Sequence, residues 1–443
     1  MSLIRVSHLS FTYDGGTEPV FQDASFEWDT DWKLGLTGRN GRGKTTLLRL
    51  LMGEFEFRGS IASSTGFDYF PFPAGRLHGT AGEAALAVGQ CEEWRIVREC
   101  SLLGLEDEAL ERPFGSLSYG ERAKVLLAAL FCRENRYLLI DEPTNHLDMQ
   151  ARRQVAGYLR RQEKGFLLIS HDRAFLDHCV DHVMSIERTG VLVHKGNFST
   201  YLEEKQRREA SEAAQRSKLE KEIVRLSQAA GQTASWSGRA ERAKYRTDSS
   251  SGSIDRGYVG HKAAKVMKRA KQMQQRSERA MEEKKGLLQN LEISEPLKLA
   301  QLPYPGDRLA EVRHVTVLYG HKEALRDCSL TIRTGERLAL SGPNGCGKTT
   351  LLRLLLGELS PSEGEVILGN HLQISYVPQD TSAMTGGVRE YARRAGVEES
   401  LYLALLRKLG FSRALFERDL AQLSAGQRKK AAIARSLCER AHL

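Results

Sequence analysis

Two glycine-rich loops carry the residue types that bind phosphate. The first runs GRNGRGKT from Gly38, and the second runs GPNGCGKT from Gly342. Both fit G-x-x-x-x-G-K-[ST], where backbone N–H groups surround a phosphate, the lysine adds charge and the hydroxyl is offered to Mg²⁺. The loops predict nucleotide binding through Gly38, Asn40, Gly41, Gly43, Lys44, Thr45, Thr46, Gly342, Asn344, Gly345, Gly347, Lys348, Thr349 and Thr350, with Thr45 and Thr349 as metal ligands.

A pair of carboxylates follows an apolar run in the first half of the chain. Tyr137–Ile140 reads as a buried strand and ends in Asp141 and Glu142. We expect Asp141 to hold Mg²⁺, directly or through water, and Glu142 to polarise an attacking water. An Asp-Glu pair can also cap a helix. The sequence TNHLD directly after it, and His171 at the end of LLISHD, favour catalysis by Glu142 and His171 instead.

Two short Ser–Gly motifs offer a second type of anion site. LSYGE contains Ser118 and Gly120, and LSAGQ contains Ser424 and Gly426. A serine and a glycine before a helix present a hydroxyl and free N–H groups to a negative charge. Each glycine loop is expected to face the Ser–Gly motif of the other copy across a sandwiched ATP.

These motifs recur at a nearly constant distance. The second glycine loop lies 304 residues after the first, and LSAGQ lies 306 residues after LSYGE. Tyr13 in SFTYDG is likewise echoed by Tyr319 in TVLYGH, so both tyrosines join the expected nucleotide-binding residues. The chain therefore contains two copies of one domain. The second copy stops before a counterpart of LLIDEPTNHLD, which predicts a truncated second domain.

The elements that position these residues alternate between strand and helix. Leu34–Leu36 reads as a short strand leading into the first loop, and Thr45–Met52 begins a helix. Tyr137–Ile140 and Phe166–Ile169 are apolar runs typical of strands buried on both faces. This alternation predicts an α/β fold, with a mainly parallel sheet covered by helices on both sides.

A basic segment separates the two copies. Residues 203–290 contain 21 Lys and Arg against 12 Asp and Glu, a net charge of +9 that equals the formal charge of the whole chain. Phe198–Ser227 and Tyr258–Leu291 read as helices, and Gly231–Gly257 reads as a loop. A basic helical hairpin suits a polyanionic partner, although a simple spacer fits too. The predicted domains are 1–202, the linker 203–300, and 301–443.

Composition excludes several classes of protein. No apolar run reaches the roughly 18–20 residues of a membrane helix, and the first residues do not resemble a signal peptide. The seven cysteines form no CxxC pair, which argues against a disulfide framework, a zinc site or an iron–sulfur cluster. These features predict a cytoplasmic protein of two or three domains.

Taken together, the motifs resemble those of ABC ATPases. TNHLD after the carboxylates, and two domains joined by a linker, are similar to the ABC-F family. The stretch Arg256–Lys271 resembles its ribosome-protection, antibiotic-resistance branch. The resemblance implies hydrolysis of ATP to ADP and phosphate with Mg²⁺, and a monomer whose two ABC domains pair with each other. It also implies binding at the ribosomal exit site, with the linker contacting rRNA and tRNA and protecting the peptidyl-transferase region from antibiotics.

Two positions depart from the family pattern. Gln379 in SYVPQ matches the glutamine loop, so the resemblance implies a further metal ligand there, whereas DYFPF places Phe72 at the matching position of the first copy. Tyr119 stands where a signature glycine is common. These changes predict slower hydrolysis at the first site and a looser second site. A general ABC-F translation factor, the ATPase subunit of an exporter and a DNA-repair ATPase are the competing interpretations.

Overall fold

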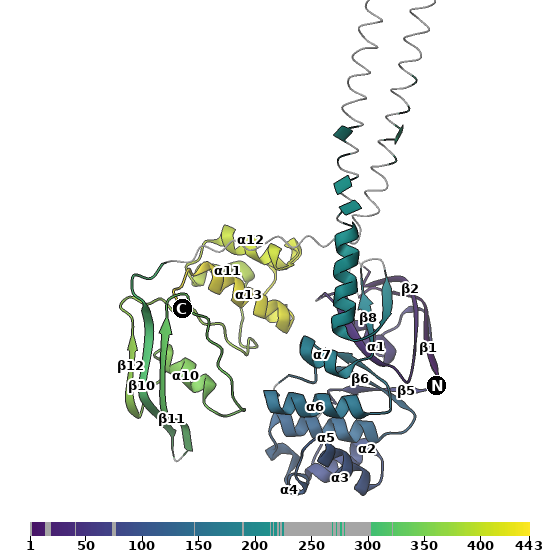
Figure 1. Cartoon of the computed structure of the whole chain (residues 1–443), viewed down its shortest axis with the longest axis horizontal. Helices are drawn as coiled ribbons and strands as arrows, with labels where there is room; N and C mark the ends of the chain where they lie inside the picture. The colour runs from purple at the N-terminus through teal and green to yellow at the C-terminus, as the bar shows by residue number, and fades with distance from the viewer. Residues whose placement is uncertain are drawn as a thin grey trace, which may run out of the picture. The chain divides into compact units, whose positions relative to one another are not determined.

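The computed structural model describes residues 2–13, 19–39, 41–72, 77–145, 147–187, 190–212, 303–320 and 322–443, with scattered residues between 214 and 279. The chain divides into two compact units, Met1–Leu291 and Glu292–Leu443 (Figure 1). Residues 198–212 are helical, and the rest of the expected helical linker falls largely outside the described residues. The domain boundaries at 202 and 300 stay a prediction.

A three-stranded antiparallel sheet, in the order β2-β1-β4, lies over the glycine-loop helix of the first unit. It consists of β1 (Leu3–Phe11), β2 (Phe21–Asp29) and β4 (Arg58–Ala62). Its apolar residues, among them the fully buried Trp28, share one core with α1 (Lys44–Leu51) and one face of a larger sheet. This core fixes the helix that begins at the first glycine loop.

The larger sheet has six strands in the order β5-β6-β7-β3-β8-β9. Neighbours are parallel except for β8 and β9. The first glycine loop begins at the end of β3, the carboxylate pair stands at the end of β6 and His171 follows β7, so all three reach the same edge of the sheet. The strands are β3 (Lys33–Gly38), β5 (Gly66–Phe70), β6 (Arg136–Asp141), β7 (Phe166–Ile169), β8 (His182–Ile186) and β9 (Val191–Lys195).

Strand β6 is buried on both faces, as its apolar run predicts. Leu138 and Ile140 join the core beneath the helices, while Tyr137 and Leu139 join the core beneath the three-stranded sheet. Each fully buried side chain of this size stabilises the fold by about 1.5–3 kcal/mol. The α/β fold with a mainly parallel sheet is thereby confirmed.

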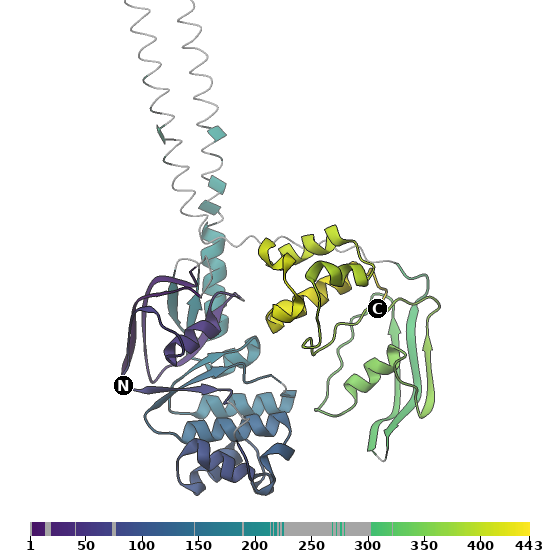
Figure 2. The same ribbon diagram turned by 180° about the vertical axis from the view of Figure 1, so that it is seen from behind.

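The other helices of the first unit cover the opposite face of the large sheet. Figures 1 and 2 show α5 and α6 next to the sheet, with α3 and α4 on their far side. These helices are α2 (Ala81–Gly89), α3 (Glu93–Leu102), α4 (Asp107–Glu111), α5 (Tyr119–Cys132), α6 (Met149–Arg161) and α7 (Arg173–Cys179), with a 3-10 turn at Phe114–Ser116.

The second unit repeats part of this plan. Strands β10 (Arg308–Tyr319), β11 (Lys322–Arg333) and β12 (Glu363–Leu368) have the order β11-β10-β12, matching β2-β1-β4. Helix α10 (Lys348–Leu355) packs against this sheet. A separate core contains α11 (Val388–Arg394), α12 (Glu399–Lys408), α13 (Ala425–Cys438) and the 3-10 turns Arg413–Glu417 and Leu420–Gln422.

Residues 337–342 and 373–377 correspond in the repeat to β3 and β5, yet neither segment forms a strand. In the first unit β3 is hydrogen-bonded to β7 and β8, and β5 to β6. Among residues 303–320 and 322–443 the structure shows no strand besides β10, β11 and β12. Leu338 is therefore 46% exposed, whereas its counterpart Leu34 is 0% exposed.

Candidate nucleotide-binding and catalytic site

The first glycine loop has the backbone that an inward-facing ring of N–H groups requires. Gly43, the residue before α1, has a φ of 91°, and a Cβ there would lie 2.5 Å from the Val20 side chain. A larger residue would be both strained and crowded. The Lys44 ammonium donates to the carbonyls of Gly38 at 2.7 Å and Arg39 at 3.3 Å, and burial lowers its pKa. Asn40 lies outside the described residues.

Asp141 sits at the end of β6 beside the loop. Its Oδ2 accepts hydrogen bonds from the Thr45 hydroxyl at 3.2 Å and from the Tyr69 hydroxyl at 3.1 Å. Burial raises the pKa of Asp141, and the two hydrogen bonds and Lys44 act in the opposite direction. The structure thus brings the expected metal ligands Thr45 and Asp141 together.

Glu142 is held in a left-handed backbone conformation, with a φ of 53°. Its N–H donates to the carbonyl of Ile169 at 2.9 Å, which ties the end of β6 to the end of β7. The His171 N–H donates to Oε2 at 3.4 Å, and His171 Nε2 lies 3.5 Å from Oε1. Burial raises the pKa of Glu142, while His171 opposes that shift. A carboxylate with a raised pKa is the better proton acceptor.

These residues fit a small, hard cation such as Mg²⁺. Glu142 Oε1 is buried and accepts no hydrogen bond from any described residue. The two expected metal ligands, Asp141 Oδ2 and the Thr45 hydroxyl, lie 3.2 Å apart. Among the described residues no group of three His, Cys, Asp or Glu forms a metal-binding cluster. Mg²⁺ takes one or two protein oxygens and completes its shell with water and phosphate.

Tyr13 also belongs to this part of the first unit. Its hydroxyl lies 2.8 Å from the Thr46 hydroxyl, and its ring packs edge-on against Phe11 and Phe55. Tyr13 is 44% exposed. Its counterpart Tyr319, at the end of β10, is 47% exposed.

Both Ser–Gly motifs start helices with a capping box. Ser118 Oγ accepts from the Glu121 N–H at 3.3 Å, and the Ser118 N–H donates to Glu121 Oε2 at 2.7 Å. Ser424 and Gln427 repeat this arrangement at 3.2 and 3.0 Å. The serine hydroxyls are thus used by their own helices α5 and α13. Gly120 and Gly426 lie in the first turns of these helices, and the pairing of each motif with the other copy's loop stays a prediction.

Tyr119, in the place of the signature glycine, is 70% exposed beside Ser118. The Arg122 guanidinium lies 5.6 Å from its ring centroid. Its ring is therefore held at the start of α5 by a neighbour one turn further along the helix.

The second glycine loop has the same local geometry. Helix α10 follows Gly347, whose φ is 91°, and Lys348 donates to the carbonyls of Gly342 at 2.9 Å and Pro343 at 2.7 Å. Thr349 and Gln379 are exposed. No carboxylate contact to Thr349 like that between Asp141 and Thr45 occurs in the described part of the second unit.

Sequence reasoning identified Phe72 and missed Tyr69. Phe72 packs against the core formed by the helices, so the side chain at the glutamine-loop position serves packing. Tyr69 contacts Asp141 from the neighbouring strand β5. The signal in the sequence that could have identified Tyr69 was its hydroxyl, three residues before Phe72 at the glutamine-loop position. Only the pairing of β5 with β6 gives that residue its partner.

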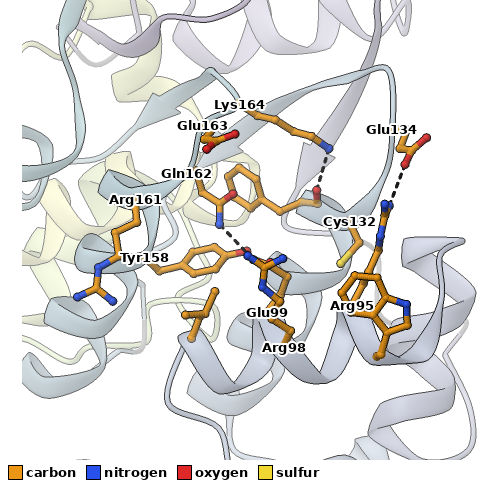
Figure 3. A pocket seen from close by; sticks show the side chains of 13 residues that line it. Arg95, Arg98, Glu99, Cys132, Glu134, Tyr158, Arg161, Gln162, Glu163 and Lys164 are labelled. Atoms are coloured by element: carbon orange, nitrogen blue, oxygen red, sulfur yellow. Dashed lines mark hydrogen bonds and ion pairs between the residues drawn. The ribbon is translucent and has the colours of Figure 1, made fainter.

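A hollow of about 550 Å³ lies near the other end of α5 (Figure 3). Its polar groups are largely occupied by one another. Glu99 Oε2 accepts from the Tyr158 hydroxyl at 2.7 Å and from Gln162 Nε2 at 3.2 Å. Lys164 donates to two carbonyls at the end of α5, and Arg95 pairs with Glu134 at 2.8 Å. These bonds tie α3, α5 and α6 together.

A glycine loop between a parallel strand and a helix, with carboxylates ending a nearby strand, defines a P-loop nucleotide-binding domain. The model of the ABC transporter family matches residues 21–145 and 325–443, together more than half of the chain. The chain belongs to this family and carries two ABC domains. No helix in the described part of the chain has the length and apolar character needed to span a membrane.

Several relatives are similar over most of the chain. The ribosome protection protein VmlR of Bacillus subtilis (strain 168) is 27% identical over 96% of this chain and 75% of its own length. ABC transporter F family member 2 of Arabidopsis thaliana is 26% identical over 97% of this chain and 67% of its own length. A solved structure of the archaeal ribosome recycling factor aABCE1 with the ribosomal stalk protein aP1 shares the fold, with a TM-score of 0.55 and 18% identity over 92% of this chain and 72% of that one.

Proposed function

We propose that this chain is an ABC-F ATPase whose first unit hydrolyses ATP to ADP and phosphate with Mg²⁺. The observation that supports the proposal is the assembly of Lys44, Thr45, Asp141, Glu142 and His171 at one edge of a single sheet. Each of these side chains has a chemical role in phosphoryl transfer to water.

The residues divide the reaction among them. When ATP binds, the Lys44 ammonium donates to phosphate oxygens in place of the loop carbonyls. Its positive charge then lies beside the negative charge of the phosphates. Thr45 and Asp141 would hold Mg²⁺, which neutralises charge on the phosphates. Glu142 accepts a proton from a water molecule while the oxygen of that water attacks the γ phosphorus. The bond between the γ phosphorus and the β–γ bridging oxygen breaks, and ADP leaves with that oxygen. His171, at 3.5 Å, keeps the Glu142 carboxylate oriented.

Exchange of Glu142 for Gln tests this assignment. The change keeps the size of the side chain and removes the base, so ATP hydrolysis should fall by about 10²–10⁴-fold while ATP binding is retained. Hydrolysis is followed by phosphate release and binding by equilibrium dialysis. Turnover at the parent rate would exclude Glu142 as the base.

The ribosome is the proposed partner. The proposed role is to protect ribosomes in the cytoplasm from antibiotics. The similarity to VmlR, whose name is ribosome protection protein, supports this, as does the net charge of +9 in residues 203–290. Basic side chains bind RNA phosphates by releasing counterions, so such binding weakens with salt.

Co-sedimentation with ribosomes tests the partner. The Glu142→Gln chain should pellet with ribosomes in ATP more than the parent, because the bound nucleotide is not consumed. Changing Lys262, Lys265, Lys268 and Arg269 to Gln in that variant should lower pelleting and flatten its dependence on KCl. ATP binding should be unchanged. If the amount of protein that sediments with ribosomes changes neither with ATP nor with the four substitutions, the proposed partner is contradicted. If cells that express the protein keep the drug susceptibility of cells without it, the protective role is contradicted.

A further inference from the structure

The carboxylate of Asp141 is held from two directions. Thr45, which donates to Oδ2 at 3.2 Å, belongs to the glycine loop. Tyr69, which donates to the same oxygen at 3.1 Å, belongs to β5. The parallel pairing places Tyr69 opposite Leu139, two residues before Asp141, and the tyrosine ring packs against the core beneath the three-stranded sheet.

The second copy has the polar residue Gln379 at the place where the first copy, just after β5, has Phe72. Phe72 lies three residues beyond Tyr69 and packs against the helical core. Its side chain can neither bind a cation nor hold a water. Of the side chains in β5, Tyr69 is the one that contacts the Asp141 carboxylate in the described structure.

We propose that Tyr69 is a positioning residue of the first nucleotide site, which holds the Asp141 carboxylate in one orientation. Two donors on one oxygen restrict rotation of the Asp141 carboxylate, so the side chain needs less ordering when Mg²⁺ arrives. The effect acts through Asp141 and concerns metal-dependent nucleotide binding. This inference rests on the proposed Mg²⁺–ATP function of the site.

The test is a Mg²⁺ titration of nucleotide binding to the full chain. Lys348→Ala is introduced first so that the first site dominates binding of N-methylanthraniloyl-ATP, which is followed by its fluorescence. Tyr69→Phe keeps the packed ring and removes the hydroxyl. It should raise the half-saturating Mg²⁺ concentration by about three- to tenfold, which corresponds to the loss of one ordinary hydrogen bond. Affinity for the analogue in EDTA should change by less than about twofold.

Two controls separate positioning from a general effect on the fold. Tyr376→Phe makes the same substitution at the matching place of the second copy, where no Asp141-like contact is described, and should leave the titration unchanged. In an Asp141→Asn background, Tyr69→Phe should add nothing, because residues that act through each other are not additive.

The outcomes are distinct. If Tyr69→Phe matches the parent, or weakens binding equally with and without Mg²⁺, or adds its full effect to Asp141→Asn, Tyr69 is no positioning residue and the ATP site stands. If the parent shows no Mg²⁺-dependent binding at all, the proposed function fails together with the inference.

Discussion

The helices that follow Gly43 and Gly347 are alike in detail. Both run KTTLLRLL, both start after a glycine with a φ of 91°, and both place the lysine ammonium on the carbonyl of the first loop glycine. Their surroundings differ. Strands β6 and β7 bring Asp141 and His171 to the first loop, whereas residues 337–342, before the second loop, pair with no strand in the described part of the second unit. The loop is encoded locally, but the catalytic set depends on the sheet.

Removing the lysine from each loop gives the largest expected difference between the two units. Lys44→Ala should lower ATP hydrolysis by at least about 100-fold, because the charge that faces the phosphates beside the base is lost. Lys348→Ala should change the rate by less than about threefold. Phosphate release at saturating ATP measures both. An equal loss in the two variants would mean that the loops contribute equally to turnover.

A pair of matched leucines tests whether the difference in surroundings changes the stability of the two units. Leu34 is fully buried in β3, and its repeat counterpart Leu338 is 46% exposed. Leu34→Ala should destabilise the first unit by about 2–5 kcal/mol. Leu338→Ala should cost less than about 0.5 kcal/mol. Amide hydrogen exchange in β3 and in residues 337–342 reports each change, and a large cost at Leu338 would show that this segment is buried in solution.

The capping serines test a feature that the two units share, because Ser118 and Ser424 form the same capping box. Ser118→Ala and Ser424→Ala should each cost about 1 kcal/mol, since each leaves a helix N–H without its side-chain acceptor. Exchange protection in the first turns of α5 and α13 measures the cost. A difference of more than about 1 kcal/mol between the two would contradict equivalent caps.

Features with a local cause could be predicted from the sequence. The apolar runs Tyr137–Ile140 and Phe166–Ile169 are β6 and β7 almost to the residue. The helix expected over Thr45–Met52 begins at Lys44 and has Met52 as its cap. Each of these follows from hydrophobic pattern or turn chemistry within a few residues, so tertiary contacts did not need to be known.

Features that depend on strand pairing could not be predicted. The bond between Tyr69 and Asp141 exists because β5 runs parallel to β6 with one register. A shift of one residue would turn the tyrosine to the other face of the sheet. The loss of polarity at Phe72 was visible in the sequence, but its packing against the helical core was not.

The left-handed backbone of Glu142 has a consequence for how variants of this chain would be ranked. A non-glycine residue in this conformation is destabilised by about 1 kcal/mol, and glycine or asparagine would relieve much of that cost. The same change would also remove a buried carboxylate oxygen that accepts no hydrogen bond from the described residues. A screen that selects heat-resistant variants would therefore favour replacement of the proposed base, and the most durable molecules it returned would be the least active.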